Sequence, residues 1–401
     1  MIDDELQVLG VETQKKKQRK WLFGTLGFMA GIAVVAIVSL VVRFAIMDSG
    51  EGQGLKDNPR ASGYTTIVPD LQHAVDSLLN DMLATIDGLQ GQAIVMKVQT
   101  GDILAMAGRE RNFEGKYQPC NNFAYQQVMG TLNHTVSILT ALETGKVNLS
   151  DMVDTGNGIW DAGKGWIMED YNWRRGGYGI ITLDRAMEIS SNIGISKTIW
   201  KVFKGHEQDF FNMLDSMSFG KPDSIEGIDG LQPASFDSPK DPEWVDKNVL
   251  WSAIGYNQKM TPIQMLTFYN AIANNGKMVK PTLKTGKVEV INPQIASKEN
   301  ISRMQTVLYH VVSQGLGKKA GTELVKVAGK TGTSISNEIE FGEDLYVNEY
   351  HVAFCGYFPA NAPKYSIIVS MNKLGLPASG GGMAGPVFHD IVEWMVRHKM
   401  K

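Results

Sequence analysis

The chain has 401 residues, of which 43% are hydrophobic and 20% charged, and its formal net charge is −3 at pH 7. This composition excludes a mostly disordered protein, because the apolar side chains suffice for a sizeable core. The near-neutral charge balance gives no general reason to bind nucleic acid, so we expect no nucleic-acid partner. Two cysteines, Cys120 and Cys355, exclude a disulfide framework and a four-thiolate metal site, but they leave one disulfide possible.

The N-terminal segment predicts a membrane anchor. Residues 15–20 read KKKQRK, and the following residues 21–42 carry no charge. A helix of that length rises about 33 Å, which is enough to cross a bilayer. The alternative is a cleaved signal peptide, which would have an apolar region of about 7–15 residues and a small-residue cleavage site. Arg43 and Phe44 follow instead, and we therefore predict an uncleaved transmembrane helix over 21–43.

The basic cluster before this helix also predicts its orientation. Lys and Arg residues remain on the cytoplasmic side, so residues 1–20 are expected to form a cytoplasmic tail. The polar, Gly-rich residues 44–63 read as a linker. We expect a single-pass protein of the inner (plasma) membrane, with the lipid bilayer as a partner and a periplasmic or extracytoplasmic domain over 64–401. A linker of about twenty residues would hold that domain within about 70 Å of the membrane.

The domain begins with a helix and a hairpin, in chain order. Apolar residues recur at helical spacing in VPDLQHAVDSLLNDMLATI, with Asp70 as the predicted N-cap. AIVMKV and ILAMAG then predict two strands joined by the turn QTGD. Helices and Gly-rich loops are expected over about 120–275. Strands return near the end of the chain, before a last helix PVFHDIVEWMVRH. This order predicts an α+β fold whose sheet joins both ends of the domain.

Patterns typical of nucleotide and metal sites are incomplete in this chain. Residues 380–385 fit G-x-G-x-x-G, but no second strand and no acidic residue follow at the required spacing. The seven histidines show no metal-binding spacing. We therefore expect neither a metal nor a cofactor.

Two short motifs remain. Lys330-Thr331-Gly332 lies on a predicted late strand and is followed by Thr333, and Ser190-Ser191-Asn192 ends a short helix about 140 residues earlier. A lysine and hydroxyl groups on a strand edge can hold a carboxylate, and a serine with an amide can relay a proton and align a peptide. Either motif alone is weak evidence, but their order and separation together are specific.

These motifs and their surroundings resemble the transpeptidase domain of penicillin-binding proteins, in particular the class B type, over about residues 64–401. The stretches that carry the resemblance are TTIVPDLQHAV, GQAIVMKVQTGDILAMAG, GGYGIITLDRAMEISSNIGISK, SAIGYNQKMTPIQMLTFYNAIANNGKMVKP, VAGKTGTS and HVAFCGYFPANAPKYSIIVSM. The resemblance implies the penicillin-binding transpeptidase and serine β-lactamase-like fold. That fold has a five-stranded antiparallel sheet flanked by helices, and an all-helical subdomain that carries the middle motif. Class B members usually carry a pedestal domain before the transpeptidase, for which residues 44–63 leave no room.

The resemblance breaks at the family's nucleophile motif, S-x-x-K. The helix that should begin with this motif reads GTLNHTVSILTALETGKV, so Thr131 stands at the serine position and His134 at the lysine position. A literal S-x-x-K, Ser218 to Lys221, lies after the S-S-N motif and is interpreted as coincidence. A neutral imidazole is a possible base near pH 7, but the β-methyl of Thr131 and the shorter reach of His134 count against catalysis.

The resemblance also implies roles for the remaining residues. Ser190 and Lys330 stand at positions of the family's catalytic machinery, together with Thr131 and His134. Asn192, Thr331, Gly332 and Thr333 would bind substrate, with the N–H groups of Thr131 and Thr333 as oxyanion donors. Three functions follow from these roles. The first is a catalytically impaired domain that binds a peptidoglycan stem peptide or a β-lactam, and whose partners are membrane proteins of cell-wall synthesis or division. The second is an active D,D-transpeptidase or carboxypeptidase that uses Thr131, and the third is a sensor of β-lactams or wall fragments.

Overall fold

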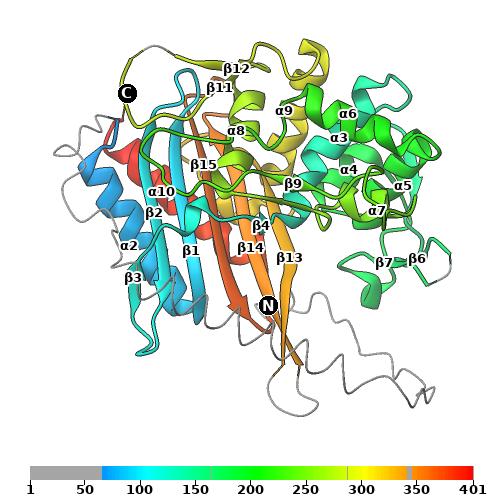
Figure 1. Cartoon of the computed structure of the whole chain (residues 1–401), viewed down its shortest axis with the longest axis horizontal. Coiled ribbons are helices and arrows are strands. Elements are labelled where there is room, and N and C mark those ends of the chain that lie inside the picture. The colour runs from blue at the N-terminus through cyan, green and yellow to red at the C-terminus, as the bar shows by residue number, and fades with distance from the viewer. Residues whose placement is uncertain (1–65, 164, 287, 341–345, 401) are drawn as a thin grey trace.

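The computed structural model describes residues 66–163, 165–286, 288–340 and 346–400. Its centre is one antiparallel sheet, whose strand order is β13-β14-β15-β1-β2-β3 (Figure 1). The strands are β1 (Gly88–Lys97), β2 (Ile103–Arg111), β3 (Tyr117–Pro119), β13 (Ala328–Glu340), β14 (Tyr346–Phe358) and β15 (Tyr365–Leu374). Because β1 pairs with β15, the sheet joins the two ends of the domain, which confirms the α+β prediction.

The sheet has six strands, so the expected number of five was wrong. The additional strand, β3, pairs with the end of β2 from Arg109 to Arg111. It is three residues long and mostly exposed. A strand this short has no alternating apolar pattern, which is why the sequence did not indicate it.

The predicted tail, anchor and linker, over 1–20, 21–43 and 44–63, lie outside the described residues. Within the described ranges, no helix combines the length and the apolar character that crossing a bilayer requires.

Helices cover both faces of the sheet. Side chains alternate between the two faces along each strand, so one strand contributes residues to the core on either side. On β1, Ala93 and Val95 belong to the core beneath α2 (Pro69–Thr85) and α10 (Gly385–Arg397). Ile94 and Met96 belong to the core on the opposite side, which contains α8 (Pro262–Ala273). Both cores are therefore built from neighbouring residues of the same strands.

The first helix begins one residue earlier than its predicted cap. Val68 is the N-cap of α2 and Pro69 is its first residue, so Asp70 lies inside the first turn. Proline is favoured at this position because its fixed φ suits a helix and no N–H is lost from the hydrogen-bond ladder.

The subdomain beside the sheet is helical but not wholly so. Its helices and those that join it to the sheet are α3 (His134–Glu143), α4 (Leu183–Glu188), α5 (Asn192–Phe203), α6 (Glu207–Ser216), α7 (Asn248–Ala253) and α9 (Lys298–Ser313). Short antiparallel ladders join β5 (Met152–Asp154) to β8 (Ile180–Thr182), β6 (Ile159–Asp161) to β7 (Ile167–Glu169), β11 (Met278–Val279) to β12 (Val290–Asn292), and β10 (Gln258–Met260) to both β4 (Gln127–Val128) and β9 (Ser235–Phe236). The expectation of an all-helical subdomain was therefore wrong.

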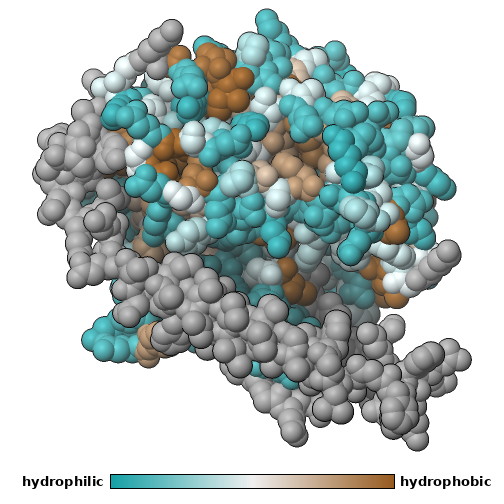
Figure 2. All heavy atoms as spheres, in the orientation of Figure 1, coloured by the Kyte–Doolittle hydropathy of each residue, from teal (hydrophilic) through white to brown (hydrophobic). Residues whose placement is uncertain are grey.

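The surface over this subdomain is mainly hydrophilic. Figure 2 shows teal side chains across most of the visible face, with separate small apolar patches between them.

A glycine-rich turn packs against the backbone of β13 and β14. The turn Gly380–Ala384 is a single π-helical turn before α10. A Cβ atom on Gly380 would lie 2.2 Å from the carbonyl oxygen of Gly332 and 2.3 Å from that of Ala353. Both neighbours are backbone atoms of the sheet, so glycine is required for this close approach.

Gly380→Ala is expected to lower the free energy of unfolding by about 1–3 kcal/mol, because backbone atoms must move to admit the methyl group. Gly385→Ala is the matched control, since its Cβ would meet no atom closer than 3.5 Å. The measurement is urea unfolding of both variants. Equal stabilities would contradict the close packing of this turn.

Candidate active-site groove

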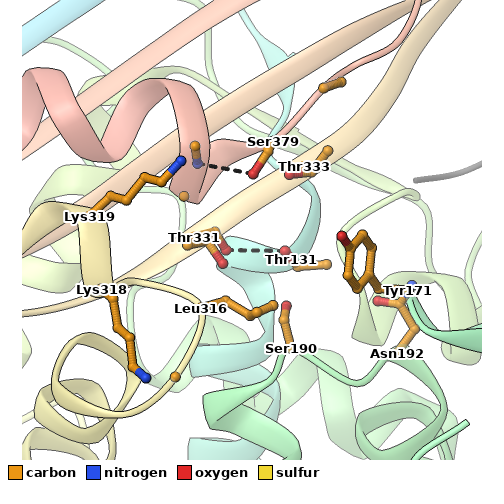
Figure 3. Close-up of a pocket in the computed structure, with 14 residues that line it drawn as sticks. Thr131, Tyr171, Ser190, Asn192, Leu316, Lys318, Lys319, Thr331, Thr333 and Ser379 are labelled. Carbon is orange, nitrogen blue, oxygen red and sulfur yellow. Dashed lines mark hydrogen bonds between the residues drawn. The ribbon is translucent and has the colours of Figure 1, made fainter. Parts of the chain in front are cut away.

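A groove lies between β13, the turn before α3, the start of α5 and the loop before α10 (Figure 3). Its cavity has a volume of about 150 Å³. The lining residues are Thr131, Tyr171, Ser190, Asn192, Gly315, Leu316, Lys318, Lys319, Thr331, Thr333, Ala378, Ser379, Gly381 and Gly382. The structure thus brings together residues from all three motif regions identified in the sequence.

Thr131 lies in the 3₁₀ turn Gly130–Asn133, which leads into α3. Gly130 has φ +55° and lies against β13, where a Cβ would come within 2.8 Å of Ser334 Cβ. The turn is also held by α8, because the buried Tyr269 hydroxyl donates to the Leu132 carbonyl at 2.9 Å. The Thr131 hydroxyl donates to the carbonyl oxygen of Thr331, with Oγ1 and O separated by 3.1 Å.

His134 is the first residue of α3 and is completely buried. Neither of its ring nitrogens has a hydrogen-bond partner within the described part of the chain. Burial lowers the pKa of the imidazole well below its usual value, and the nearby Lys330 adds to this, while the Asn192 amide opposes it only in part. His134 is therefore a neutral group beneath the groove and is not hydrogen-bonded to Thr131.

The Ser190–Asn192 turn joins α4 to α5. Ser190 has φ +56°, a left-handed conformation that is uncommon for a residue with a side chain. Ser191 caps α5 by accepting from the Gly194 N–H, and Asn192 donates from its side chain to the Glu169 carbonyl at 3.1 Å. These contacts leave the Ser190 side chain facing the cavity (Figure 3).

Asp170, which follows β7, holds this turn in place through hydrogen bonds. Its carboxylate accepts from Ser191 Oγ at 2.7 Å and from the Ile193 N–H at 3.1 Å. The residue is 1% exposed, and this burial raises the pKa of the carboxyl to about 6 although both hydrogen bonds favour the charged form. Sequence analysis missed Asp170, because a single acidic residue in a loop carries no motif.

Lys330 lies on β13 and is completely buried. Its Nζ is 2.7 Å from Ser190 Oγ and 3.0 Å from the Thr331 carbonyl oxygen. Burial is the only cause acting on its pKa, which falls to about 7, so among the described residues no carboxylate compensates its charge. Ser190 and Lys330 therefore join the two motifs through one direct hydrogen bond.

The strand edge of β13 supplies backbone groups to the groove. β13 is the outermost strand of the sheet. The Thr331 carbonyl points away from β14, as the hydrogen bonds that it accepts from Thr131 and Lys330 indicate. Backbone groups alternate along an antiparallel strand, so the Thr333 N–H points the same way. Gly332 lies between them against the turn, where a Cβ would be 2.8 Å from Leu132 Cγ.

Several groove residues carried no signal in the sequence. Tyr171 and Leu316 come from turns, and Lys318 and Lys319 come from the short 3₁₀ helix Lys318–Ala320. The glycines of 380–385 were interpreted as a loop, and a run of glycines does indicate close backbone approach, which is the use the structure makes of them.

The remaining sequence candidates do not reach the groove. Lys221 of the literal S-x-x-K is exposed and pairs with Asp223, with 2.6 Å between Nζ and Oδ2. Cys120 and Cys355 are both free thiols, so the possible disulfide is not formed.

Asp170 gives the stability of the fold a defined pH dependence. Its pKa is raised on folding, so its contribution to the free energy of unfolding is greatest below about pH 3.9 and declines as the pH rises to about 6. Asp170→Asn does not titrate, so wild type should lose stability relative to this variant across that window, by at most about 3 kcal/mol. Urea unfolding at pH 4–7 measures the difference. Asp161→Asn, at an exposed carboxylate, is the control, and a difference of opposite sign would contradict the assignment.

Comparison with known proteins agrees with this arrangement. The model of the penicillin-binding protein transpeptidase domain matches residues 91–393. Stage V sporulation protein D of Bacillus subtilis is 26% identical over 96% of this chain and 65% of its own length. Peptidoglycan D,D-transpeptidase FtsI of Escherichia coli K12 is 26% identical over 82% of this chain and 54% of its own. The chain therefore spans about half to two-thirds of the length of these relatives.

Solved structures show the same fold. The apo transpeptidase domain of penicillin-binding protein 3 from Burkholderia pseudomallei has a TM-score of 0.69 at 23% identity, covering 84% of this chain and 96% of that one. Penicillin-binding protein 3 from Mycobacterium tuberculosis, complexed with aztreonam, has a TM-score of 0.69 at 24% identity, covering 83% and 78%. With the family model matching most of the described domain, the chain belongs to the penicillin-binding protein transpeptidase domain family.

Proposed function

We propose that this protein binds a peptidoglycan stem peptide or a β-lactam in the groove, and that its Thr131–His134 pair does not carry out acyl transfer. In this proposal the protein acts beside membrane proteins of cell-wall synthesis or division. Two relatives support the ligand class by their names, since one is a peptidoglycan D,D-transpeptidase and another was solved with aztreonam.

The hydrogen bond made by Thr131 is the observation that carries the proposal. A serine or threonine hydroxyl becomes a nucleophile when an adjacent base accepts its proton. Here the hydroxyl donates to the Thr331 carbonyl, which cannot take a proton, and His134 is not hydrogen-bonded to Thr131. The lowered pKa of His134 also makes it a weaker base. Loss of a nucleophile or base costs on the order of 10⁶ in rate in a serine protease.

The groups that would bind a ligand do not require the Thr131 hydroxyl to act as a nucleophile. Lys330 and Ser190 keep their contact, and the Thr333 N–H faces the cavity from the strand edge. Lys318 and Lys319 add positive charge to the wall. A cavity with lysines and a backbone donor favours a carboxylate-bearing peptide.

Restoring the family's motif should restore acylation. The double variant Thr131→Ser/His134→Lys replaces the crowded hydroxyl and supplies a longer basic side chain. It should react with a penicillin at least about 10²-fold faster than wild type, a gain within the usual contribution of one positioned base. Intact-protein and peptide mass spectrometry measure the adduct, which should map to position 131.

The single variants Thr131→Ser and His134→Lys are the controls, and each should gain less than the pair, because a nucleophile and its base act as a unit. A penicillin adduct on Thr131 of the wild-type protein would contradict the proposal. Thermal stabilisation of wild type by a stem peptide, without an adduct on Thr131, would support it.

We also propose that residues 21–43 anchor the protein in the plasma membrane with the domain outside the cytoplasm. The uncharged length of the segment and the preceding basic cluster support this. Full-length protein should sediment with membranes and resist high-salt extraction, whereas a chain starting at residue 64 should be recovered in the aqueous fraction. Recovery of both chains in the aqueous fraction would contradict the anchor.

A further inference from the structure

We propose that Ser190, paired with Lys330, is itself a nucleophile, so that the groove slowly acylates and deacylates on Ser190 instead of at the position where the family places its serine. The inference rests on the proposed function only for the class of ligand, which is a compound with an acyl group such as a β-lactam. It adds a reaction that the Thr131–His134 pair does not provide.

The distances single out Ser190 among the hydroxyl groups of the groove. Its Oγ lies 2.7 Å from Lys330 Nζ, within hydrogen-bond distance of a basic nitrogen. Thr131 donates to a carbonyl, and Ser379 accepts from the Gly382 N–H and caps the glycine turn. Ser190 therefore has the contact between nucleophile and base that catalysis by a Ser–Lys pair requires.

The position of Ser190 suits a nucleophile. It lies in a tight turn with φ +56° between two helices, and its side chain lines the cavity that Thr131 and Thr331 also line (Figure 3). Strained backbone of this kind persists only where the surroundings enforce it. Asp170 enforces it here through Ser191 and Ile193.

Lys330 is suited to act as the base. Burial brings its pKa to about 7, so a large part of the amine is neutral at physiological pH. In the structure Lys330 Nζ–H donates both to Ser190 Oγ and to the Thr331 carbonyl. When the amine is neutral, its lone pair can accept the Ser190 proton across the same 2.7 Å contact.

Lys330 is the titratable group in direct contact with Ser190 Oγ, and the pH dependence of the reaction is assigned to it. Asp170, whose pKa is raised to about 6 by burial, reaches the Ser190 turn only through Ser191 and Ile193. Other charged and titratable groups surround the pair. Those from the surrounding elements are His134 on the helix below, Cys355 opposite on β14, and Tyr171, Lys318 and Lys319 on the groove wall. The pKa of His134 lies well below neutrality and that of the Cys355 thiol well above it, in both cases because of burial.

The reaction proceeds as follows. Ser190 Oγ attacks the acyl carbonyl carbon while its proton passes to Lys330 Nζ. The tetrahedral intermediate collapses, the carbon–nitrogen bond of the β-lactam breaks, and the departing nitrogen takes the proton from Lys330. The Thr333 N–H lies on the same wall as a donor for the oxyanion. Water, activated by the same amine, then hydrolyses the ester and regenerates Ser190.

The test is prolonged incubation of the wild-type domain with a penicillin, followed by tryptic peptide mapping. Ser190 lies in the peptide 186–197 and Thr131 in the peptide 117–146, so the two sites are separated. We expect a penicilloyl adduct on Ser190, formed about tenfold faster at pH 8 than at pH 6 because the neutral fraction of a base with pKa near 7 rises by that factor.

Two variants remove the two partners. Ser190→Gly removes the hydroxyl while accepting the positive φ, and it should abolish the adduct. Lys330→Met should slow its formation by at least about 10²-fold and remove the pH dependence. Ser313→Ala and Lys326→Met, at exposed residues outside the groove, are the matched controls.

The outcomes separate this proposal from the previous one. Penicillin binding without an adduct on Ser190 would overturn the Ser190 nucleophile and leave the binding function standing. An adduct on Thr131 would overturn the proposed function instead. A Ser190 adduct that forms equally fast in Lys330→Met would overturn the role of the lysine.

Discussion

The burial of Lys330 without a carboxylate partner among the described residues is the constraint around which the groove is organised. An ammonium group removed from water is costly, and its pKa falls until the neutral form becomes accessible. The amine then needs hydrogen-bond partners that carry no charge. Ser190 and the Thr331 carbonyl supply them, one from the helical subdomain and one from the sheet. One side chain thus connects the two halves of the domain.

The same carbonyl also accepts from Thr131, so two motif regions meet at one backbone oxygen, and Lys330 links the third through Ser190. The convergence depends on parts that lie farther away. Tyr269 on α8 holds the turn of Thr131 through the Leu132 carbonyl, and Asp170 holds the turn of Ser190. The core of the protein therefore determines the direction of each groove hydroxyl.

Much of this arrangement could be predicted from the sequence, because the short motifs can be recognised directly in it. Lys330 on a strand and Ser190 at a helix end were both identified, and alternating and helical apolar patterns indicated the main elements. Hydrogen-bond directions could not be predicted. Whether the Thr131 side chain faces His134 or Thr331 depends on the turn that Gly130 allows. The hydrogen bond from Ser191 to Asp170 joins residues about twenty positions apart, a separation that no local pattern indicates. Strand β3 was missed because three exposed residues carry no periodicity.

The outer edge of β13 has a further consequence, for association between molecules. An uncovered strand edge is a template on which another extended chain can add, and proteins that leave one open risk aggregation. Here hydroxyl groups occupy the edge on either side of Thr333, since Thr131 donates to the Thr331 carbonyl and Tyr256 accepts from the Ile335 N–H at 3.3 Å. Between these two contacts, the stretch left for pairing is about one residue long. This part of the edge, beside the groove, admits the end of a small extended ligand and leaves too little free backbone for a second long strand to pair there.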